Sequence, residues 1–186
     1  KRPSITYGHF TDPKKFLQTD LLEEMNTALA KRPTGGGIIF HFWDLSFCFL
    51  LPRGHKNFFE EPLENYRFVH SIVKISIEEY LKGRKIRSFE QSDAGGYPHF
   101  CMAKPSRYDL ILEGKKIAGA AQRKTKKTPM HQGSIFFKRP DIGVLKKIVK
   151  DQSVVKGILS ESGFIQDKGN DEDLKKILIK NFRSKI

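Results

Sequence analysis

Two side chains in one stretch of the sequence could carry out acyl transfer, the thiol of Cys101 and the ammonium group of Lys116. A thiolate attacks carbonyl carbon readily, and a nearby positive charge stabilises both the thiolate and the oxyanion that forms during the attack. A loop and a strand are expected between the two residues, so both could face one cleft. Taken alone, a cysteine near a lysine is more often a small buried side chain beside a surface charge.

A triple glycine upstream, Gly35-Gly36-Gly37, suggests a second part of the same site. Without Cβ atoms, three successive glycines let the backbone turn sharply and approach a ligand closely. Their spacing fits neither the phosphate loop GxxxxGK[ST] nor the dinucleotide motif GxGxxG. The glycines by themselves are also compatible with a plain hairpin loop.

Hydrophobic periodicity and turn residues predict the elements that position these groups. Strands are expected at residues 5–7, 38–41, 45–51, 85–89, 108–112, 116–121 and 134–137, and helices at residues 20–30, 62–82, 141–150, 154–160 and 171–182. Glu113-Gly114 is typical of a tight hairpin turn, which makes the strands around it antiparallel. Central strands with helices segregated around them predict an α+β fold, a mostly antiparallel sheet flanked by helices.

Strands 38–41 and 45–51 are expected to pair as a hairpin around residues 42–44. The second of these strands is apolar enough to be buried on both faces, which predicts that Cys48 is a buried small hydrophobe.

Length and composition limit the classes of protein to which the chain can belong. The 186 residues suit a single domain, residues 1–186, and 38% hydrophobic with 30% charged residues is ordinary for a globular chain. No apolar run approaches the ~20 residues that cross a bilayer, and no signal peptide is recognisable, which predicts a cytoplasmic protein with free thiols. Because the chain begins at Lys1 and enters a strand almost directly, we expect an N-terminal segment to be missing.

The net charge of +13 calls for an acidic partner: a nucleic acid, an anionic membrane or an acidic protein. Most basic residues lie in small separate groups that solvated surfaces also explain. The densest group, residues 123–127, is expected beside the functional cleft. No helix-turn-helix, zinc spacing or stacked-aromatic motif organises the charge, which argues against a nucleic-acid module, and no metal ligands are predicted.

The sequence resembles the lipoate protein ligase and octanoyltransferase superfamily, a relative of the biotin protein ligases. Residues 32–41 match its R-x-T-G-G-G-x-x-x-H loop, residues 114–122 its G-[KR]-K-[IV]-[AS]-G-[AS]-A-[QY] segment, and residues 5–12 resemble its S-L-G-R-x-Q-D segment. The G-R-G-R-x-G-R loop of biotin ligases is absent.

One segment departs from the family pattern. Where the family has Q-H-G-[ST], this chain has His131-Gln132-Gly133-Ser134, so the histidine has moved by one place. In an extended segment, such a shift turns a side chain to the opposite face.

The resemblance implies an acyl tunnel beneath the glycine loop. It also implies transfer of an octanoyl or lipoyl group to a lysine of an acidic lipoyl-carrier domain or of glycine cleavage H protein. Lys116 matches the family lysine that contacts the reacting carbonyl. The substrate-binding residues implied by the motifs are Arg32, Thr34, Gly35, Gly36, Gly37, His41, Gly119, Ala120, Gln122, Gln132 and Gly133.

The segment around Cys101, residues 100–110, looks like the C-F-x-x-P-S-x-Y-[ED]-[LI] stretch of the cysteine-dependent octanoyltransferases. We therefore expect Cys101 to take octanoyl from an acyl carrier protein as a thioester, without a cofactor, while Lys116 and backbone amides stabilise the oxyanion. The alternative is an ATP- and Mg-dependent lipoate ligase acting through lipoyl-adenylate, which needs no cysteine. A ligase is expected to have an accessory carboxy-terminal domain or a separate partner, and we expect the residues after 137 to leave little room for such a domain. A nucleic-acid-binding module is the remote alternative.

Overall fold

The computed structural model describes residues 2–91, 97, 99–124, 128–166 and 170–186. The strands are β1 (Ser4–Tyr7), β2 (Ala28–Lys31), β3 (Ile38–His41), β4 (Asp44–Leu50), β5 (Arg87–Ser88), β6 (Leu110–Leu112), β7 (Lys115–Arg123) and β8 (Met130–Phe136). The helices are α1 (Leu21–Glu24), α2 (Pro62–Tyr80), α3 (Ile142–Ile148), α4 (Gln152–Glu161) and α5 (Asp171–Lys185), with 3₁₀ turns η1 (Pro13–Lys15) and η2 (Cys101–Ala103).

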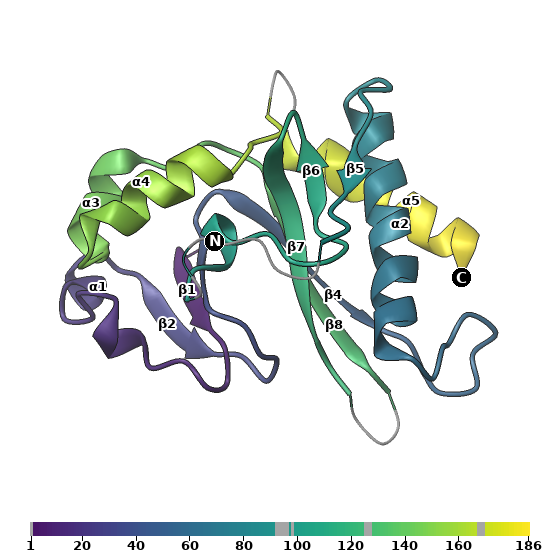
Figure 1. The fold of residues 1–186 in the computed structure, drawn as a ribbon, viewed down its shortest axis with the longest axis horizontal. Helices are drawn as coiled ribbons and strands as arrows, with labels where there is room; N and C mark the ends of the chain where they lie inside the picture. The colour runs from purple at the N-terminus through teal and green to yellow at the C-terminus, as the bar shows by residue number, and fades with distance from the viewer. Residues whose placement is uncertain (1, 92–96, 98, 125–127, 167–169) are drawn as a thin grey trace.

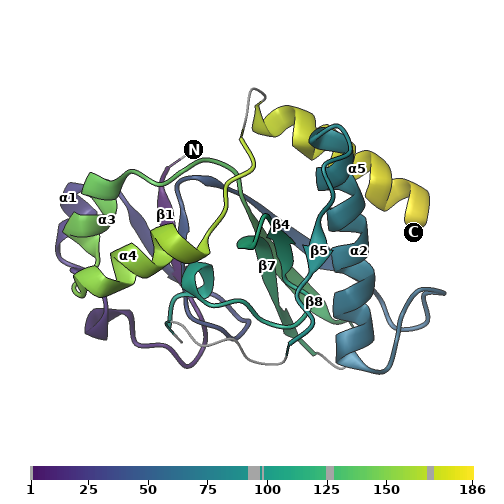
Figure 2. The same cartoon turned by 45° about the horizontal axis from the view of Figure 1, so that its top comes forward.

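The strands form two sheets, a small one in the order β2-β1-β3 and a large one in the order β4-β8-β7-β6-β5. All neighbours in the large sheet are antiparallel, whereas β1 and β2 in the small sheet are parallel. In Figures 1 and 2, α1, α3 and α4 lie beside the small sheet, and α2 and α5 cover one face of the large sheet. The predicted α+β fold with a mostly antiparallel sheet is confirmed.

Each sheet has its own hydrophobic core, and the two cores hold different halves of the candidate site. The first core joins the small sheet, α3 and α4, and it includes Phe100, Met102 and Ala103 around η2. The second core joins α2, α5 and the large sheet, and it includes Ile117 and Ala118 of β7. Cys101 is therefore anchored by one core and Lys116 by the other.

The long helix and the hairpin turn form where the sequence predicts them. Pro62 begins α2 after the Glu61 cap, whose side chain accepts from Leu63 N, and Gly83 follows the helix with φ +90°. Proline suits the first helical position because its fixed φ is helical and the N–H that it lacks would have no partner there. Glycine suits the position after the helix because it adopts a positive φ without strain. Glu113 and Gly114 both have positive φ, as a two-residue turn between antiparallel strands requires.

The helix predicted at residues 20–30 is wrong beyond its first turn. Only Leu21–Glu24 is helical, because the chain turns at Asn26, whose φ is +48°. Residues 28–31 then form β2, which pairs in parallel with β1. Backbone pairing with a distant strand has overridden the local helical pattern. A short window of sequence does not contain that pairing.

The predicted hairpin of residues 38–41 and 45–51 is also wrong. β3 pairs with β1 in the small sheet, whereas β4 pairs with β8 in the large sheet. Phe42 and Trp43, between the two strands, pack against the first core, so this short connection carries the chain from one sheet to the other.

Cys48 is exposed, which corrects its predicted burial. β4 is the edge strand of the large sheet and alternates between half-buried and exposed positions instead of being covered on both faces. An apolar run is compatible with either a central or an edge strand, and only the pairing order distinguishes them.

Two buried histidines between α2 and β8 make the fold sensitive to acid. Burial lowers the pKa of His70 to about 4 and that of His131 well below its ordinary value. Their Nε2 atoms have no hydrogen-bond partner among the described residues. Both imidazoles are therefore neutral in the folded protein at pH values where an unfolded chain would already bind protons.

We predict that the free energy of unfolding falls as the pH is lowered from 6.5 towards 4, because only the unfolded state binds a proton at His70 in that window. The loss from His70 is on the order of 2 to 3 kcal/mol. Urea unfolding of the native chain and of His70→Gln, measured between pH 7.5 and 4.5, tests this. The His70→Gln variant should lose less stability over that range, whereas the exposed His9→Gln control should match the native chain. Equal pH dependence of all three chains would contradict the prediction.

Candidate active site

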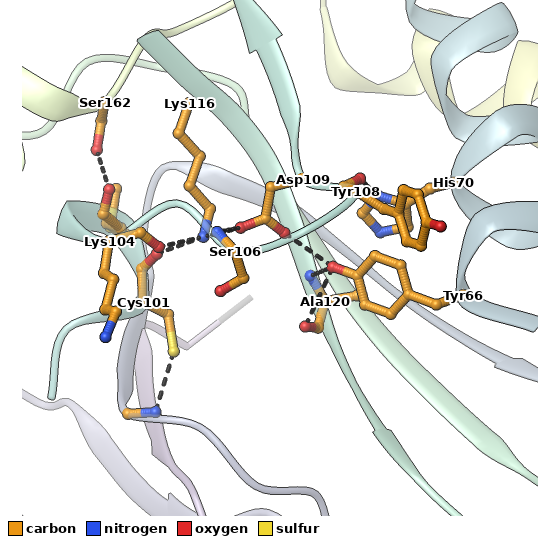
Figure 3. A network of polar contacts seen from close by, with 12 residues as sticks. Tyr66, His70, Cys101, Lys104, Ser106, Tyr108, Asp109, Lys116, Ala120 and Ser162 are labelled. Carbon is orange, nitrogen blue, oxygen red and sulfur yellow. Dashed lines mark hydrogen bonds and ion pairs between the residues drawn. The ribbon is translucent and has the colours of Figure 1, made fainter. Parts of the chain in front are cut away.

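The Cys101 thiol lies between the glycine loop, residues 32–37, and the large sheet. Phe100, which precedes it, is buried in the first core and forms an isolated parallel bridge with Ile38 of β3. This pairing brings the Sγ atom of Cys101 to 3.1 Å from Gly37 N, which donates to it, and to 3.7 Å from Nη2 of Arg32. Figure 3 shows the thiol pointing towards that backbone amide.

Arg32 holds the glycine loop in shape from the inside. Its guanidinium is buried and donates to the carbonyl oxygens of Gly35 (2.9 Å from Nη2) and Gly37 (2.7 Å from Nη2). Gly36 has φ +88°, and a Cβ there would lie 2.9 Å from Arg32 Nη2 and 3.3 Å from Cys101 Sγ. Glycine is needed at this position both for the backbone and for the approach of the guanidinium to the thiol.

Lys116 is buried beside Cys101 but is bound to other atoms than the thiol. Its Nζ lies 2.6 Å from Oδ2 of Asp109 and donates to the carbonyl oxygens of Cys101 (2.7 Å) and Lys104 (2.9 Å). An ammonium group has three hydrogens. All three are engaged in this structure, and two of them bind the backbone of the segment that carries Cys101 (Figure 3).

Asp109 in turn is held by α2 and by its own loop. Its Oδ1 accepts from the hydroxyl of Tyr66 at 2.8 Å, and its Oδ2 accepts from Ser106 N at 2.7 Å. The same Tyr66 oxygen accepts from Ala120 N of β7 at 2.9 Å. Burial, and then the charge of Asp109, raise the pKa of Tyr66 well above its ordinary value, so it remains a neutral phenol that donates.

Gly119 leaves the space that this network occupies. A Cβ at this position would lie 2.7 Å from Lys116 Cε and 2.8 Å from Asp109 Oδ1. Gly119 therefore makes room for the side chains of Lys116 and Asp109.

A cavity of about 680 Å³ lies between the two sheets, and both Cys101 and Lys116 line it. Eight of the predicted substrate-binding residues also line it: Arg32, Gly36, Gly37, His41, Gly119, Ala120, Gln132 and Gly133. The wall also includes a polar network in which Asp44 Oδ2 accepts from Ser46 and Ser134 and lies 2.7 Å from His41 Nδ1.

The remaining three predicted binding residues are not among those that line the cavity. Thr34 is fully buried and donates to Gln132 Oε1 at 2.9 Å, and Gly35 accepts from Arg32. The Gln122 amide lies against Nδ1 of His131, on the α2 side of the large sheet. Of the basic group predicted beside the cleft, Arg123 donates to Pro33 O, and residues 125–127 lie outside the described residues.

The shift of one place in the His131-Gln132 pair has the expected geometric effect. Gln132 faces the cavity, whereas His131 is buried on the other side of β8, where its ring lies 5.0 Å from that of Tyr66. Alternate residues of a strand point to opposite faces, so the glutamine takes the cavity position in this chain.

Three residues of the site were missed by the sequence argument: Tyr66, Asp109 and Asp44. Asp109 lies within the segment that carries the resemblance, and Tyr66 lies within the predicted helix of residues 62–82. The available signal for Asp109 was a charged residue near the start of the predicted strand 108–112, because a charge that becomes buried requires a partner.

Comparison with known proteins fits this geometry. The model of the lipoyl protein ligase A/B catalytic domain matches residues 1–183. The chain belongs to this family. The resemblance found in the sequence is thereby confirmed, and the site lies within the lipoyl protein ligase A/B catalytic domain.

The relatives of this domain include bacterial octanoyltransferases. Octanoyltransferase LipM of Bacillus cereus is 27% identical over 138 residues, and that of Staphylococcus epidermidis is 30% identical over 140 residues. Each alignment covers 72% of this chain and 50% of the relative, so the chain spans about half the length of the curated relatives it matches.

Solved structures show the same fold. The putative lipoate protein ligase Ta0514 from T. acidophilum, with bound lipoic acid, has a TM-score of 0.76 at 20% identity, and the match covers 99% of this chain and 69% of that one. Lipoate-protein ligase A bound with ATP has the same TM-score, identity and coverage. Within the described residues, no helix could span a membrane, and no group of three or more His, Cys, Asp or Glu could hold a metal ion.

Loss of the buried ion pair between Lys116 and Asp109 should destabilise this lipoyl ligase-type domain far more than loss of a surface ion pair. We predict that Asp109→Asn lowers the free energy of unfolding by about 3 kcal/mol or more, because it leaves the buried ammonium uncompensated. Glu60→Gln, which breaks the exposed pair with Arg53, should cost less than about 1 kcal/mol. Urea unfolding of both variants measures the difference, and equal losses would refute the buried-pair interpretation.

Proposed function

We propose that this chain transfers an octanoyl or lipoyl group, through a thioester on Cys101, to a lysine of a lipoyl-carrier domain. The observation that carries the proposal is the position of the Cys101 thiol. It lines the cavity, 3.1 Å from a backbone amide and 3.7 Å from a guanidinium, in a chain related to octanoyltransferases.

The reaction takes place in two balanced steps. In the first, Cys101 Sγ bonds to the acyl carbon of an octanoyl thioester on acyl carrier protein, the donor C–S bond breaks, and the thiol proton ends on the donor sulfur. In the second, the amine of the carrier lysine bonds to the acyl carbon, the bond to Cys101 breaks, and an amine proton returns to Sγ. No cofactor is needed.

The cavity is suited to hold the acyl chain during both steps. Ile39, Ala121 and Phe136 contribute apolar surface to its wall. Burial of six methylene groups at about 0.8 kcal/mol each would contribute on the order of 5 kcal/mol to binding of the octanoyl tail.

The net positive charge of the chain favours acidic proteins as both the donor and the acceptor of the acyl group. The chain has a net charge of +13, which speeds encounter with acidic proteins such as acyl carrier protein, lipoyl domains and glycine cleavage H protein. A structural neighbour is described as a bi-partite lipoate protein ligase with its E2 lipoyl domain from Thermoplasma acidophilum, with a TM-score of 0.73 to this chain.

The second candidate is an ATP-dependent lipoate ligase, because the chain shares its fold with a ligase that binds ATP. The cavity fits Mg²⁺ poorly. Among the described residues that line it, Asp44 is the one carboxylate, and its Oδ2 is engaged by His41, Ser46 and Ser134. Magnesium bound with a nucleotide usually takes one or two free carboxylates from the protein. We therefore favour the transferase.

We predict that incubation with octanoyl-acyl carrier protein adds one octanoyl group to the chain and that Cys101→Ser abolishes the adduct. Intact-mass spectrometry measures it. The matched control is Cys48→Ser, which removes the other thiol and should retain the adduct. Absence of the adduct from the native chain, or its persistence in Cys101→Ser, would exclude the thioester route.

The ligase alternative has its own test. With ATP, Mg²⁺ and free lipoate or octanoate, we expect no release of pyrophosphate above background, measured by a coupled phosphate assay. Pyrophosphate release that depends on the free acid and is unaffected by Cys101→Ser would establish the ligase instead.

A further inference from the structure

We propose that Tyr66 of α2 is a positioning residue for the turn that carries Cys101. Its hydroxyl orients Asp109, and Asp109 in turn holds the ammonium of Lys116 against that turn (Figure 3). The proposal deepens the proposed function, and it rests on that function where acyl transfer is the quantity measured. Tyr66 lies outside the sequence motifs, on a helix that covers one face of the large sheet.

The hydroxyl of Tyr66 takes the place of a strand neighbour that β7 lacks. The ladder between β6 and β7 ends at the pair of Leu110 and Ala118. Ala120 N, two residues further along β7, donates to the Tyr66 oxygen at 2.9 Å. The hydroxyl has one hydrogen, and Asp109 Oδ1 at 2.8 Å is a nearer acceptor for it than Ala120 O at 3.3 Å. Tyr66 therefore joins the end of the sheet to the buried carboxylate.

Both oxygens of the Asp109 carboxylate have a fixed partner in this arrangement. Oδ1 accepts from Tyr66, whereas Oδ2 accepts from Ser106 N at 2.7 Å and lies 2.6 Å from Lys116 Nζ. The side chain is 1% exposed, so an oxygen that lost its donor would be costly. The carboxylate would then turn towards its remaining donors. That movement would draw Nζ away from the carbonyl oxygen of Cys101, which it now binds at 2.7 Å.

The backbone that precedes Asp109 is strained, and α2 holds it at a second point. Tyr108 has φ +68°, in the left-handed region that a bulky side chain rarely adopts. Nδ1 of His70, one helical turn after Tyr66, lies 2.9 Å from Tyr108 O. A neutral imidazole that bonds to a carbonyl oxygen carries its hydrogen on that nitrogen, so His70 donates. Strained residues persist where the surrounding contacts impose them, and they cluster at functional sites.

Hydrogen exchange tests the proposal without an acyl donor, so its outcome is independent of whether octanoyl transfer occurs. Tyr66→Phe removes only the hydroxyl. We expect the amides of residues 100–110 to exchange at least about tenfold faster in this variant at pH 7, because the loss loosens one segment locally. Residues 4–7 of the small sheet should exchange as before. Unchanged exchange at residues 100–110, or an equal increase at residues 4–7, would overturn the proposal. Peptide-level mass spectrometry measures both.

Tyr80→Phe is the matched control. Tyr80 lies on the same helix, and its buried hydroxyl has no hydrogen-bond partner among the described residues. The variant removes the same atom from the same element without breaking a bond, so exchange at residues 100–110 should stay within about twofold of the native chain. An increase as large as that of Tyr66→Phe would show that loss of any hydroxyl from α2 has this effect, and would exclude the positioning role.

The rate of octanoyl transfer separates positioning from substrate binding. Tyr66 is not among the residues that line the cavity. With octanoyl-acyl carrier protein as donor and a lipoyl domain as acceptor, we expect Tyr66→Phe to lower kcat at least about tenfold and to change KM less than about threefold. An unchanged kcat, or a change confined to KM, would contradict the proposal. A native chain that transfers no octanoyl would instead refute the proposed function, and hydrogen exchange would still decide the role of Tyr66.

A second variant restores the donor and covers the case in which Tyr66→Phe does not fold. 4-Aminophenylalanine at position 66 has N–H groups where tyrosine has its hydroxyl, so it can still donate to Asp109. Exchange at residues 100–110 and kcat should both stay within about threefold of the native chain. A folded chain with this side chain that exchanges about tenfold faster there, or has an about tenfold lower kcat, would disprove the role of the hydroxyl as a donor.

Discussion

The buried ion pair between Lys116 and Asp109 is the interaction on which the candidate site depends. It connects three separate parts of the chain: strand β7, the segment that carries Cys101, and, through the Tyr66 hydroxyl, helix α2. A buried pair of charges stabilises a fold only when its remaining hydrogen-bonding capacity is satisfied. Here the backbone of Cys101, Lys104 and Ser106 supplies the remaining hydrogen bonds. The position of the Cys101 turn therefore depends on the ion pair.

The two positive charges near the thiol differ in their surroundings. The ammonium of Lys116 is paired with a carboxylate, whereas the guanidinium of Arg32 donates to neutral groups. A compensated ion has a weak field beyond its partner, whereas an uncompensated one stabilises an anion that forms beside it.

The sequence motifs identified much of the cavity wall but not the contacts behind it. The glycine loop and the β7 segment both contribute to one cavity, as their joint resemblance to a family suggested. Tyr66 escaped notice because a tyrosine on the apolar face of a helix is ordinary, and its role depends on Asp109 and Ala120 lying opposite. Cys48 was misplaced because an apolar strand looks the same whether it is central or at an edge.

The sequence by itself determined the class of fold, the long helix α2, the tight turn at Glu113-Gly114, and the family to which the chain belongs. The helix and the turn follow from local rules, because capping, positive φ and hydrophobic period act within a few residues. The family followed from the resemblance of the motifs at residues 32–41 and 114–122. Only the tertiary structure decided that β3 and β4 part into different sheets, that residues 28–31 form a strand, and which cation faces the Cys101 thiol. Pairing between distant strands and burial of charge depend on what lies opposite in space, which no window of sequence contains.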